Sequence, residues 1–273
     1  MEEINDFFSD KSWFITWVIS AIAYLITAYG IAFFVFVVLY KLFKREAHHR
    51  KIQKEYTSDK MVNFEFRMSF TTLFIHTIAG LVVIYFASTG HTFIYTNIDE
   101  RGIGYFILSI FFMILLHDTY FYWTHRLMHL PKLYPVIHRT HHISVNPSPW
   151  AAYSGDPWEA AIAGGIFPLI AWTIPAHWLA MVIFLIYMLF MSVMGHAGFE
   201  FYPRGFSKSW IGRWQTTASH HNMHHQYFEG NYGIYFNFWD KIMKTERHDY
   251  HEHYGKLFKD KLSRERESKL PEA

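Results

Sequence analysis

Residues 12–40 form one apolar run, SWFITWVISAIAYLITAYGIAFFVFVVLY, that contains no charged side chain. About 20 apolar residues in a helix cross the hydrocarbon core of a bilayer, so this run is long enough to span a membrane. It is too long for the core of a signal peptide, and the acidic residues Glu2, Glu3 and Asp6 precede it rather than a basic region. We therefore predict a membrane anchor that is retained in the mature protein.

Further apolar runs follow, in a chain that is 51% hydrophobic, 20% aromatic and only 18% charged. Pro175 lies in TIPAH, between the last two runs, where it favours a break. The run before it is short, so these two segments are expected to form a hairpin that does not span fully on both legs. We predict an all-α integral membrane protein with about four transmembrane helices. The further runs are residues 69–90, 105–116, 160–172 and 178–194.

Basic residues predict the orientation of the chain. The connection between the first two runs is rich in lysine and arginine, whereas residues 91–104 hold one arginine and two acids. The positive-inside rule then places the first connection in the cytoplasm and the N-terminus outside. Counting spans puts residues 124–158, and everything after about residue 194, on the cytoplasmic side as a helical cap. A short chain without a dilysine tail favours a bacterial inner membrane, or the endoplasmic reticulum if the source is eukaryotic.

Composition excludes several classes of protein. The net charge of +2 gives no reason to expect a nucleic-acid partner, and the absence of cysteine excludes thiolate catalysis and iron–sulfur ligation. The sequence suggests three regions. They are an N-terminal membrane region at 1–100, a catalytic region at 101–255, and a charged, solvated tail at 256–273.

Histidine is the outlier in composition, with 19 residues, and eleven of them gather at 117–142, at 196 and at 220–225. Residues three and four apart share one face of a helix, so each short motif can aim two or three imidazoles at one point. All three motifs lie on the predicted cytoplasmic side. The motifs are H-x-x-x-H at His125 and His129, H-x-x-H-H at His138, His141 and His142, and H-x-x-H-H at His221, His224 and His225.

Metal binding is the chemistry that this spacing favours. Clustered imidazoles repel one another when protonated, whereas neutral imidazole is a good metal ligand. Eight or nine histidines exceed the needs of one ion, so we predict two. Nitrogen ligands suit iron, zinc, copper or nickel. The zinc hydrolase motif H-E-x-x-H is absent. A histidine-rich two-metal centre at a membrane face favours redox iron and dioxygen.

At these motifs the sequence resembles the fatty acid hydroxylase/sterol desaturase superfamily of membrane diiron oxygenases. The family pattern also has an isolated histidine between the two H-x-x-H-H motifs, which corresponds here to His196. The segments DTYFYWTHRLMH, HRTHHISVNPSPWAAYSGDPWEA and NYGIYFNFWDKIMKT resemble the C-5 sterol desaturase branch and its bacterial relatives. The resemblance covers about half of the chain, roughly residues 105–245.

The resemblance implies two irons held by these nine histidines, with O2 as co-substrate. It implies hydroxylation or desaturation of a lipid, either a sterol or a fatty acyl chain. Electrons would come from a separate cytochrome b5 or ferredoxin with its NAD(P)H reductase, since no fused haem-binding segment is evident. Two departures are visible. Asp156 stands where relatives often have histidine, and Lys244 precedes Thr245 where many have glycine.

Four further residues are candidates for supporting roles or additional ligation. At 100° per residue, Asp118 lies within about 20° of both His125 and His129, which suits a carboxylate that orients a ligand ring. His117 lies about 80° from His125 and is a weaker candidate. Asp156 and His220 are possible ligands or supporting residues.

Alternative functions make different predictions. A zinc-dependent membrane hydrolase would contain zinc and consume no O2. A haem-binding electron carrier would need paired histidines at mid-membrane depth, and a transporter would need polar residues through its spans. The aromatic segment 200–215 suits either the lipid headgroups or the roof of a lipid channel. Its basic residues could also face an acidic electron carrier, although basic residues simply mark the cytoplasmic side as well.

Overall fold

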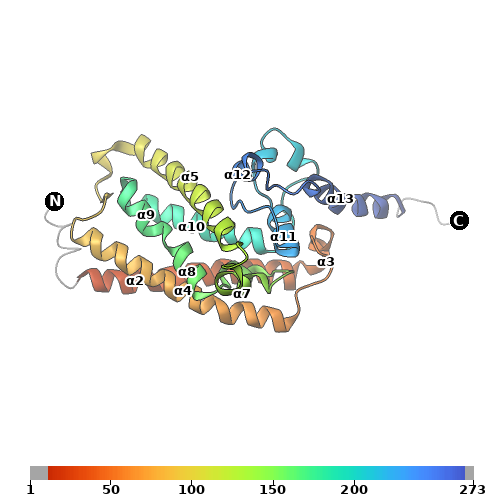
Figure 1. Cartoon of the computed structure of the whole chain (residues 1–273), viewed down its shortest axis with the longest axis horizontal. Coiled ribbons are helices and arrows are strands. Elements are labelled where there is room, and N and C mark those ends of the chain that lie inside the picture. The colour runs from red at the N-terminus through yellow and green to blue at the C-terminus, as the bar shows by residue number, and fades with distance from the viewer. Residues whose placement is uncertain (1–11, 268–273) are drawn as a thin grey trace. The chain divides into compact units, whose positions relative to one another are not determined.

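The computed structural model describes the backbone of residues 12–267 and the side chains of residues 12–258 (Figure 1). Regular structure in this part of the chain is almost entirely helical. Two strands of two residues each, β1 (Ile94–Tyr95) and β2 (Ala176–His177), are the exception. The all-α prediction is confirmed.

Four helical segments among the described residues are long and apolar enough to cross a membrane. The first combines α2 (Ser12–Phe36) with the π-helical turn η1 (Val37–Leu42). The predicted number of about four transmembrane helices is therefore confirmed. The other three are α4 (Asp59–Ser88), α5 (Gly102–Met128) and α10 (Trp178–His196).

The described chain divides into two compact units, whose segments alternate along the sequence. The first unit comprises residues 12–31, 66–141 and 153–190, and the second comprises residues 32–65, 142–152 and 191–267. The sequence-based boundaries at residues 100 and 255 do not coincide with this division. Residues 1–11, predicted to lie outside the cytoplasm, and residues 268–273 of the predicted tail fall outside the described part.

In the first unit, α2 and α4 run antiparallel and side by side (Figure 1). The Trp17 indole donates to the Thr77 carbonyl at 2.8 Å, and the Tyr24 hydroxyl lies 2.8 Å from Nδ1 of His76. These polar contacts provide hydrogen-bond partners for side chains that would find none in lipid. His76, the histidine that interrupts the second apolar run, thus has a partner within the protein.

The fourth apolar run is divided into two eight-residue helices, α8 (Pro157–Gly164) and α9 (Ile166–Thr173), and neither helix is long enough to be counted among the four spans above. The Tyr120 hydroxyl of α5 donates to the Ile162 carbonyl at 2.5 Å and lies 2.7 Å from where a Cβ on Gly165 would stand. Tyr120 of α5 thus approaches the chain closely at the break between α8 and α9.

The two-stranded sheet fixes the position of the TIPAH turn, which follows α9. β2 pairs in parallel with β1, with Ile94 opposite Ala176, and His177 Nε2 lies 2.8 Å from the Thr96 carbonyl. The TIPAH turn therefore lies at the same end of the first unit as the connection between α4 and α5. This agrees with the topology predicted for both segments. Short elements complete this unit: η3 (Ile98–Glu100), α6 (Tyr134–Ile137), α7 (Arg139–His142) and η4 (Pro149–Tyr153), the last two extending into the second unit.

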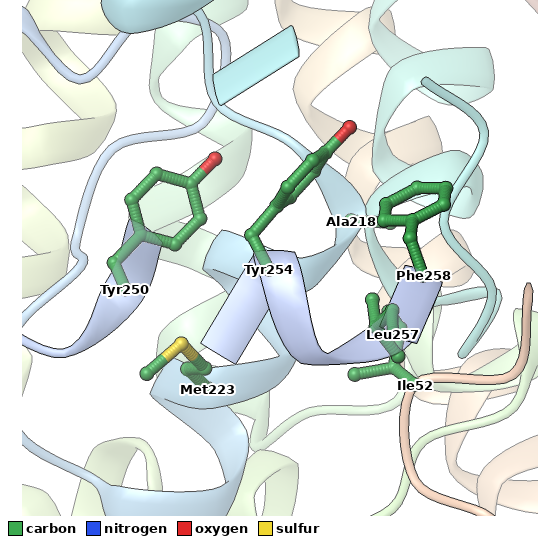
Figure 2. Packing of buried hydrophobic residues seen from close by; sticks show 7 residues of the cluster. All are labelled: Ile52, Ala218, Met223, Tyr250, Tyr254, Leu257 and Phe258. Carbon is green, nitrogen blue, oxygen red and sulfur yellow. The ribbon is translucent and has the colours of Figure 1, made fainter. Parts of the chain in front are cut away.

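The second unit has its own apolar core, where α13 packs on α11 (Figure 2). Leu257 and Phe258 of α13 lie beside Ile52, from the connection between the first two spans. The segment predicted to be a solvated tail is thus anchored at its start, and its backbone is helical to residue 267. The elements of this unit are α3 (Lys44–Ala47), η2 (His48–Arg50), η5 (Phe206–Lys208), η6 (Gly212–Trp214), α11 (Ala218–Tyr227), α12 (Phe238–Ile242) and α13 (Tyr250–Glu267).

Candidate metal centre

Three predicted ligands gather in the first unit at the end of α5. His125 lies in the last turn of α5, His129 caps that helix, and His138 caps α6. Each offers a ring nitrogen within 4.8 Å of the other two, and Nε2 of His125 is 3.0 Å from Nε2 of His138. The short connection between α5 and α6 brings the third ring back to the first two.

A carboxylate supports this cluster. Oε1 of Glu159, in the first turn of α8, lies 3.0 Å from Nδ1 of His138. A carboxyl group this close to Nδ1 favours the tautomer that carries its proton on that nitrogen, which leaves the Nε2 lone pair directed toward His125. His141, from α7, is oriented similarly, because its Nδ1 donates to the Ser154 carbonyl at 2.8 Å. Burial lowers the pKa of His141 to about 4, so its ring is neutral at physiological pH.

The second unit contains a separate group of three. His196 ends α10, and His221 and His225 lie one turn apart on α11. Nε2 of His221 is 2.9 Å from Nε2 of His196 and 3.2 Å from Nε2 of His225. All three rings are buried.

Backbone carbonyls determine the tautomers of two of these rings. Nδ1 of His196 donates to the Ser192 carbonyl at 2.8 Å, and Nδ1 of His225 donates to the Ser144 carbonyl at 3.0 Å. A carbonyl oxygen only accepts, so each neutral ring carries its proton on Nδ1 and a lone pair on Nε2. Both lone pairs point at the same nitrogen of His221, which can supply at most one proton. A cation is the group that satisfies such a convergence.

The histidines of the second H-x-x-H-H motif point in two directions: His221 and His225 toward His196, and His224 toward His142. His224 follows the same rule at Nδ1, donating to the Gly230 carbonyl at 2.7 Å, but its Nε2 lies 3.0 Å from Nε2 of His142. Consecutive helical residues point about 100° apart, so His224 and His225 cannot face the same ion. The prediction that a motif aims two or three rings at one point applies here to His221 and His225.

Among the described residues, the side chains grouped closely enough to share a metal ion are the nine histidines predicted from the motifs. The four supporting candidates belong to no such group. His117 is buried in α5 with its ring edge toward Phe184, at a centroid distance of 5.6 Å. Asp118 is buried beside it, on the face of α5 that leads toward His125. Their predicted roles stay predictions.

Asp156 has a clear contact. Its carboxylate accepts hydrogen bonds from the backbone NH and the hydroxyl of Thr140, at 3.1 and 2.7 Å. Thr140 lies between His138 and His141, so Asp156 restrains the motif through its backbone. His220 is fully buried against Tyr250, with Nε2 3.9 Å from an oxygen of Asp240.

Two supporting groups were missed from the sequence. Glu159 has a visible signal, since it is an acidic residue three positions after Asp156 in an otherwise apolar segment. Gly230 contributes only a carbonyl, which no side-chain pattern reveals. Asn231 and Asp240 hold that carbonyl in place: the Asn231 amide donates to the His220 carbonyl at 3.0 Å, and Asp240 accepts from the NH groups of Tyr232 and Gly233.

Comparison with known proteins agrees with these motifs. Residues 110–245, which include all nine histidines, match the family described as fatty acid hydroxylase. The chain belongs to the fatty acid hydroxylase/sterol desaturase superfamily. The family match supports the resemblance predicted from the motifs, and curated relatives place the chain near the C-5 sterol desaturase branch.

Three relatives illustrate the similarity. A Delta(7)-sterol 5(6)-desaturase of Gibberella zeae is 27% identical over 84% of this chain and 69% of its own length. A C-4 methylsterol oxidase of Schizosaccharomyces pombe is 34% identical over 58% of this chain and 53% of its length. A methylsterol monooxygenase of Aspergillus fumigatus is 35% identical over 51% of this chain and 47% of its own length. The matched segments thus span about half the length of the last two relatives. No solved structure matches the chain.

Proposed function

We propose that this protein is a membrane-bound, non-haem diiron oxidoreductase that hydroxylates or desaturates a lipid with O2. The four apolar helices make it a membrane protein, and its relatives carry the names of sterol desaturases and methylsterol oxidases. A sterol or a fatty acyl chain is the proposed substrate class. The nine histidines are the proposed iron ligands.

One observation supports metal binding most strongly. Nε2 lone pairs of His196 and His225 converge on Nε2 of His221, at 2.9 and 3.2 Å, with both Nδ1 protons fixed on backbone carbonyls. An all-nitrogen donor set of neutral imidazoles suits iron, zinc, copper or nickel. Two ions are proposed because nine rings exceed the roughly six positions of one octahedral ion.

The relatives favour iron over zinc, because desaturases and monooxygenases catalyse redox reactions and zinc has no redox chemistry. A zinc-dependent membrane hydrolase is the second candidate, and it has no observation in its favour beyond the histidines.

When bound, iron would supply reductive O2 activation for oxidation of a substrate C–H bond. The chain's own residues bind and orient. Backbone carbonyls and Glu159 hold protons on the Nδ1 atoms, and burial keeps water from the rings. Oxidation of a substrate C–H bond at a metal requires no side-chain nucleophile, so we assign no separate acid or base.

Further proposals concern partners and location. A separate cytochrome b5 or ferredoxin, with its NAD(P)H reductase, is proposed as the electron donor. The histidines are proposed to lie at the cytoplasmic face, because the basic connection at residues 41–60 precedes α4 on that side under the positive-inside rule. The sequence favours a bacterial inner membrane, or the endoplasmic reticulum if the source is eukaryotic. The relatives above are fungal, and this supports the endoplasmic reticulum.

The test is metal analysis of the detergent-purified chain from iron-replete cells, with reductant-dependent O2 uptake on added sterols and acyl lipids. We expect two irons per chain and lipid products with one added oxygen or two fewer hydrogens. His221→Ala should lose at least one iron, because it removes the nitrogen on which two other rings converge. His91→Ala, in an exposed loop, is the matched control and should retain both irons.

Zinc as the sole metal, with no O2 uptake, would contradict the proposal and favour the hydrolase. Retention of both irons by the folded His221→Ala variant would contradict the ligand assignment. Failure of His221→Ala and His91→Ala alike would point to a general folding defect, so each variant is first checked for monodispersity in detergent.

A further inference from the structure

Residues 201–215, which we term the cap loop, expose apolar side chains beside basic ones. Trp210 is 76% exposed and Ile211 is 62% exposed, at adjacent positions between η5 and η6. Phe201 and Trp214 are also exposed. A soluble surface seldom presents such side chains together, so this grouping marks an interaction site.

The cap loop is held in one conformation by its own contacts. The rings of Tyr202 and Phe206 stack with centroids 4.1 Å apart and planes 3° apart. The Ser209 hydroxyl accepts from the NH of Gly212 at 3.0 Å. A Cβ on Gly212 would lie 2.0 Å from the Phe206 carbonyl oxygen, so the turn requires glycine. Trp210 and Ile211 are therefore exposed by an ordered turn and not by a lack of structure.

The base of the cap loop is tied to the ends of membrane spans within the second unit. Backbone hydrogen bonds join residues 198–200 to residues 50–52: Ile52 NH donates to Gly198 at 3.0 Å, and Glu200 NH donates to Arg50 at 2.9 Å. Residues 50–52 lie in the connection between the span that ends at residue 42 and α4, and residue 198 follows the end of α10 by two positions. The cap loop therefore begins a few residues after the end of α10, beside the connection that joins the first span to α4.

The charge of the cap loop indicates the chemistry of that surface. Arg204, Lys208 and Arg213 are exposed, and residues 201–215 contain no acidic side chain. The nearest acid in sequence, Glu200, is buried and accepts hydrogen bonds from Ser219. The guanidinium of Arg213 lies 5.5 Å from the Trp214 ring centroid, so cation and aromatic group are presented together. Nothing within the loop neutralises the three cations.

We propose that the cap loop docks on an anionic lipid surface, with Trp210 and Ile211 inserted among the headgroups. Tryptophan favours the membrane–water interface, and lysine and arginine beside it bind anionic lipids. The inference goes beyond the proposed function, since it concerns how this unit contacts the bilayer and does not depend on the metal.

The chain contains no cysteine, so one introduced cysteine can carry a single label. Trp210→Cys and Ile211→Cys, each in the full chain, are labelled with an environment-sensitive fluorophore. The matched control is Glu252→Cys on α13, an exposed position outside the loop. Each protein is placed in nanodiscs of phosphatidylcholine alone, or of phosphatidylcholine and phosphatidylglycerol in equal amounts. Quenching by aqueous acrylamide is compared with quenching by lipids brominated on their acyl chains.

In the anionic nanodiscs we expect labels at 210 and 211 to be severalfold less quenched by acrylamide than the label at 252, and to be quenched by brominated lipid. The combined Arg204→Gln, Lys208→Gln and Arg213→Gln variant should remove the difference between the two lipid compositions. Equal acrylamide quenching at 210, 211 and 252 in the anionic nanodiscs would overturn the proposal. Protection at 210 that appears only after addition of an acidic redox protein would overturn it in favour of a protein partner.

Discussion

Backbone carbonyls orient several of the candidate ligand rings. Nδ1 of His141, His196 and His224 each donates to a carbonyl oxygen, at 2.7 to 2.8 Å. Such contacts fix both the ring rotation and the nitrogen that keeps its lone pair. His138 differs from these rings, because its Nδ1 lies 3.0 Å from Oε1 of Glu159. Burial raises the pKa of Glu159 well above its usual value, and a cation bound by His138 would favour the ionised carboxylate.

Removal of this carboxylate should weaken metal retention in the first unit. We expect Glu159→Ala to reduce iron affinity by about 10- to 100-fold, the range typical of groups that orient a metal ligand, and Glu159→Gln to have a smaller effect. The measurement is iron content after dialysis against a series of chelator concentrations. Glu229→Gln, which changes an exposed glutamate, is the control. An unchanged chelator midpoint for Glu159→Ala would refute the assigned role.

Lys51 is a second residue that only the structure distinguishes. It is fully buried, its Nζ donates to Oδ1 of Asn146 at 3.2 Å, and the rings of Tyr56 and Phe199 lie 5.7 and 5.4 Å away. Burial lowers the pKa of Lys51 to about 8 from 10.5. The folded state therefore disfavours the charged form.

This shift predicts a pH dependence of stability. Between pH 8 and pH 10.5 the unfolded chain binds more protons at Lys51 than the folded chain, so the free energy of unfolding contributed by this residue rises with pH. The penalty is complete below pH 8 and disappears above pH 10.5, and it amounts to roughly 3 kcal/mol in all. Thermal midpoints in detergent between pH 7 and pH 10 test this. Lys51→Met should flatten the rise relative to wild type, and an equal slope in both proteins would contradict the prediction.

Among the structural elements, α11 depends on the connection that follows it. The carbonyl of Gly230 orients His224, and the backbone of residues 230–233 is held by Asn231 and Asp240. Asp240, at the start of α12, accepts from Tyr232 NH, Gly233 NH and the Thr245 hydroxyl, at 2.7 to 2.9 Å. Burial raises the pKa of this carboxyl, and those three hydrogen bonds oppose the rise. One buried carboxylate thus organises a loop with little regular structure.

Asp240→Asn should destabilise this loop. The amide keeps one accepting oxygen but directs an NH2 group at backbone NH donors, so we expect a loss of about 1–3 kcal/mol in unfolding free energy. Asp249→Asn is the control, because Asp249 pairs with Arg247 at the surface, and such pairs contribute about 1 kcal/mol or less. Thermal midpoints in detergent compare the two variants. Equal losses would show that Asp240 has no special role in the loop.

For the molecule as a whole, the arrangement of spans determines which connections share a side of the membrane. The pairing of β1 with β2 brings the TIPAH turn to the connection between α4 and α5. In the second unit, residues 198–200 lie against residues 50–52. Each pairing joins connections that the positive-inside rule assigns to one side. The structure and the charge distribution thus agree on which connections belong together.

Cysteine labelling can determine which side is cytoplasmic. Lys54→Cys and Asp99→Cys place single thiols at exposed positions in the two opposing connections. We expect a membrane-impermeant maleimide to label Asp99→Cys in intact cells and Lys54→Cys only after permeabilisation. The reverse pattern would invert the predicted topology, and labelling of both in intact cells would exclude it.

The four spans and the nine histidines were predictable because they depend on local properties. A bilayer requires long apolar helices, and residues three or four apart on a helix face the same way. His125 with His129, and His221 with His225, follow from this geometry alone. The sequence also allowed the fourth apolar segment to fall short of a full span. It did not reveal the break at Gly165, where Tyr120 of α5 donates to the Ile162 carbonyl.

Only the tertiary structure showed which groups contact Nδ1 of the imidazole rings. Glu159 faces His138 and the Gly230 carbonyl faces His224, because helices and loops distant in sequence pack together. Lys51 stands among other basic residues in the sequence, yet it is buried while its neighbour Lys54 is exposed. The sequence by itself determined the candidate spans and the histidine motifs proposed as metal ligands, since periodicity and hydropathy are properties of neighbours. Burial and hydrogen bonding are properties of packed elements, so tautomers, supporting groups and the exposed cap loop required the fold.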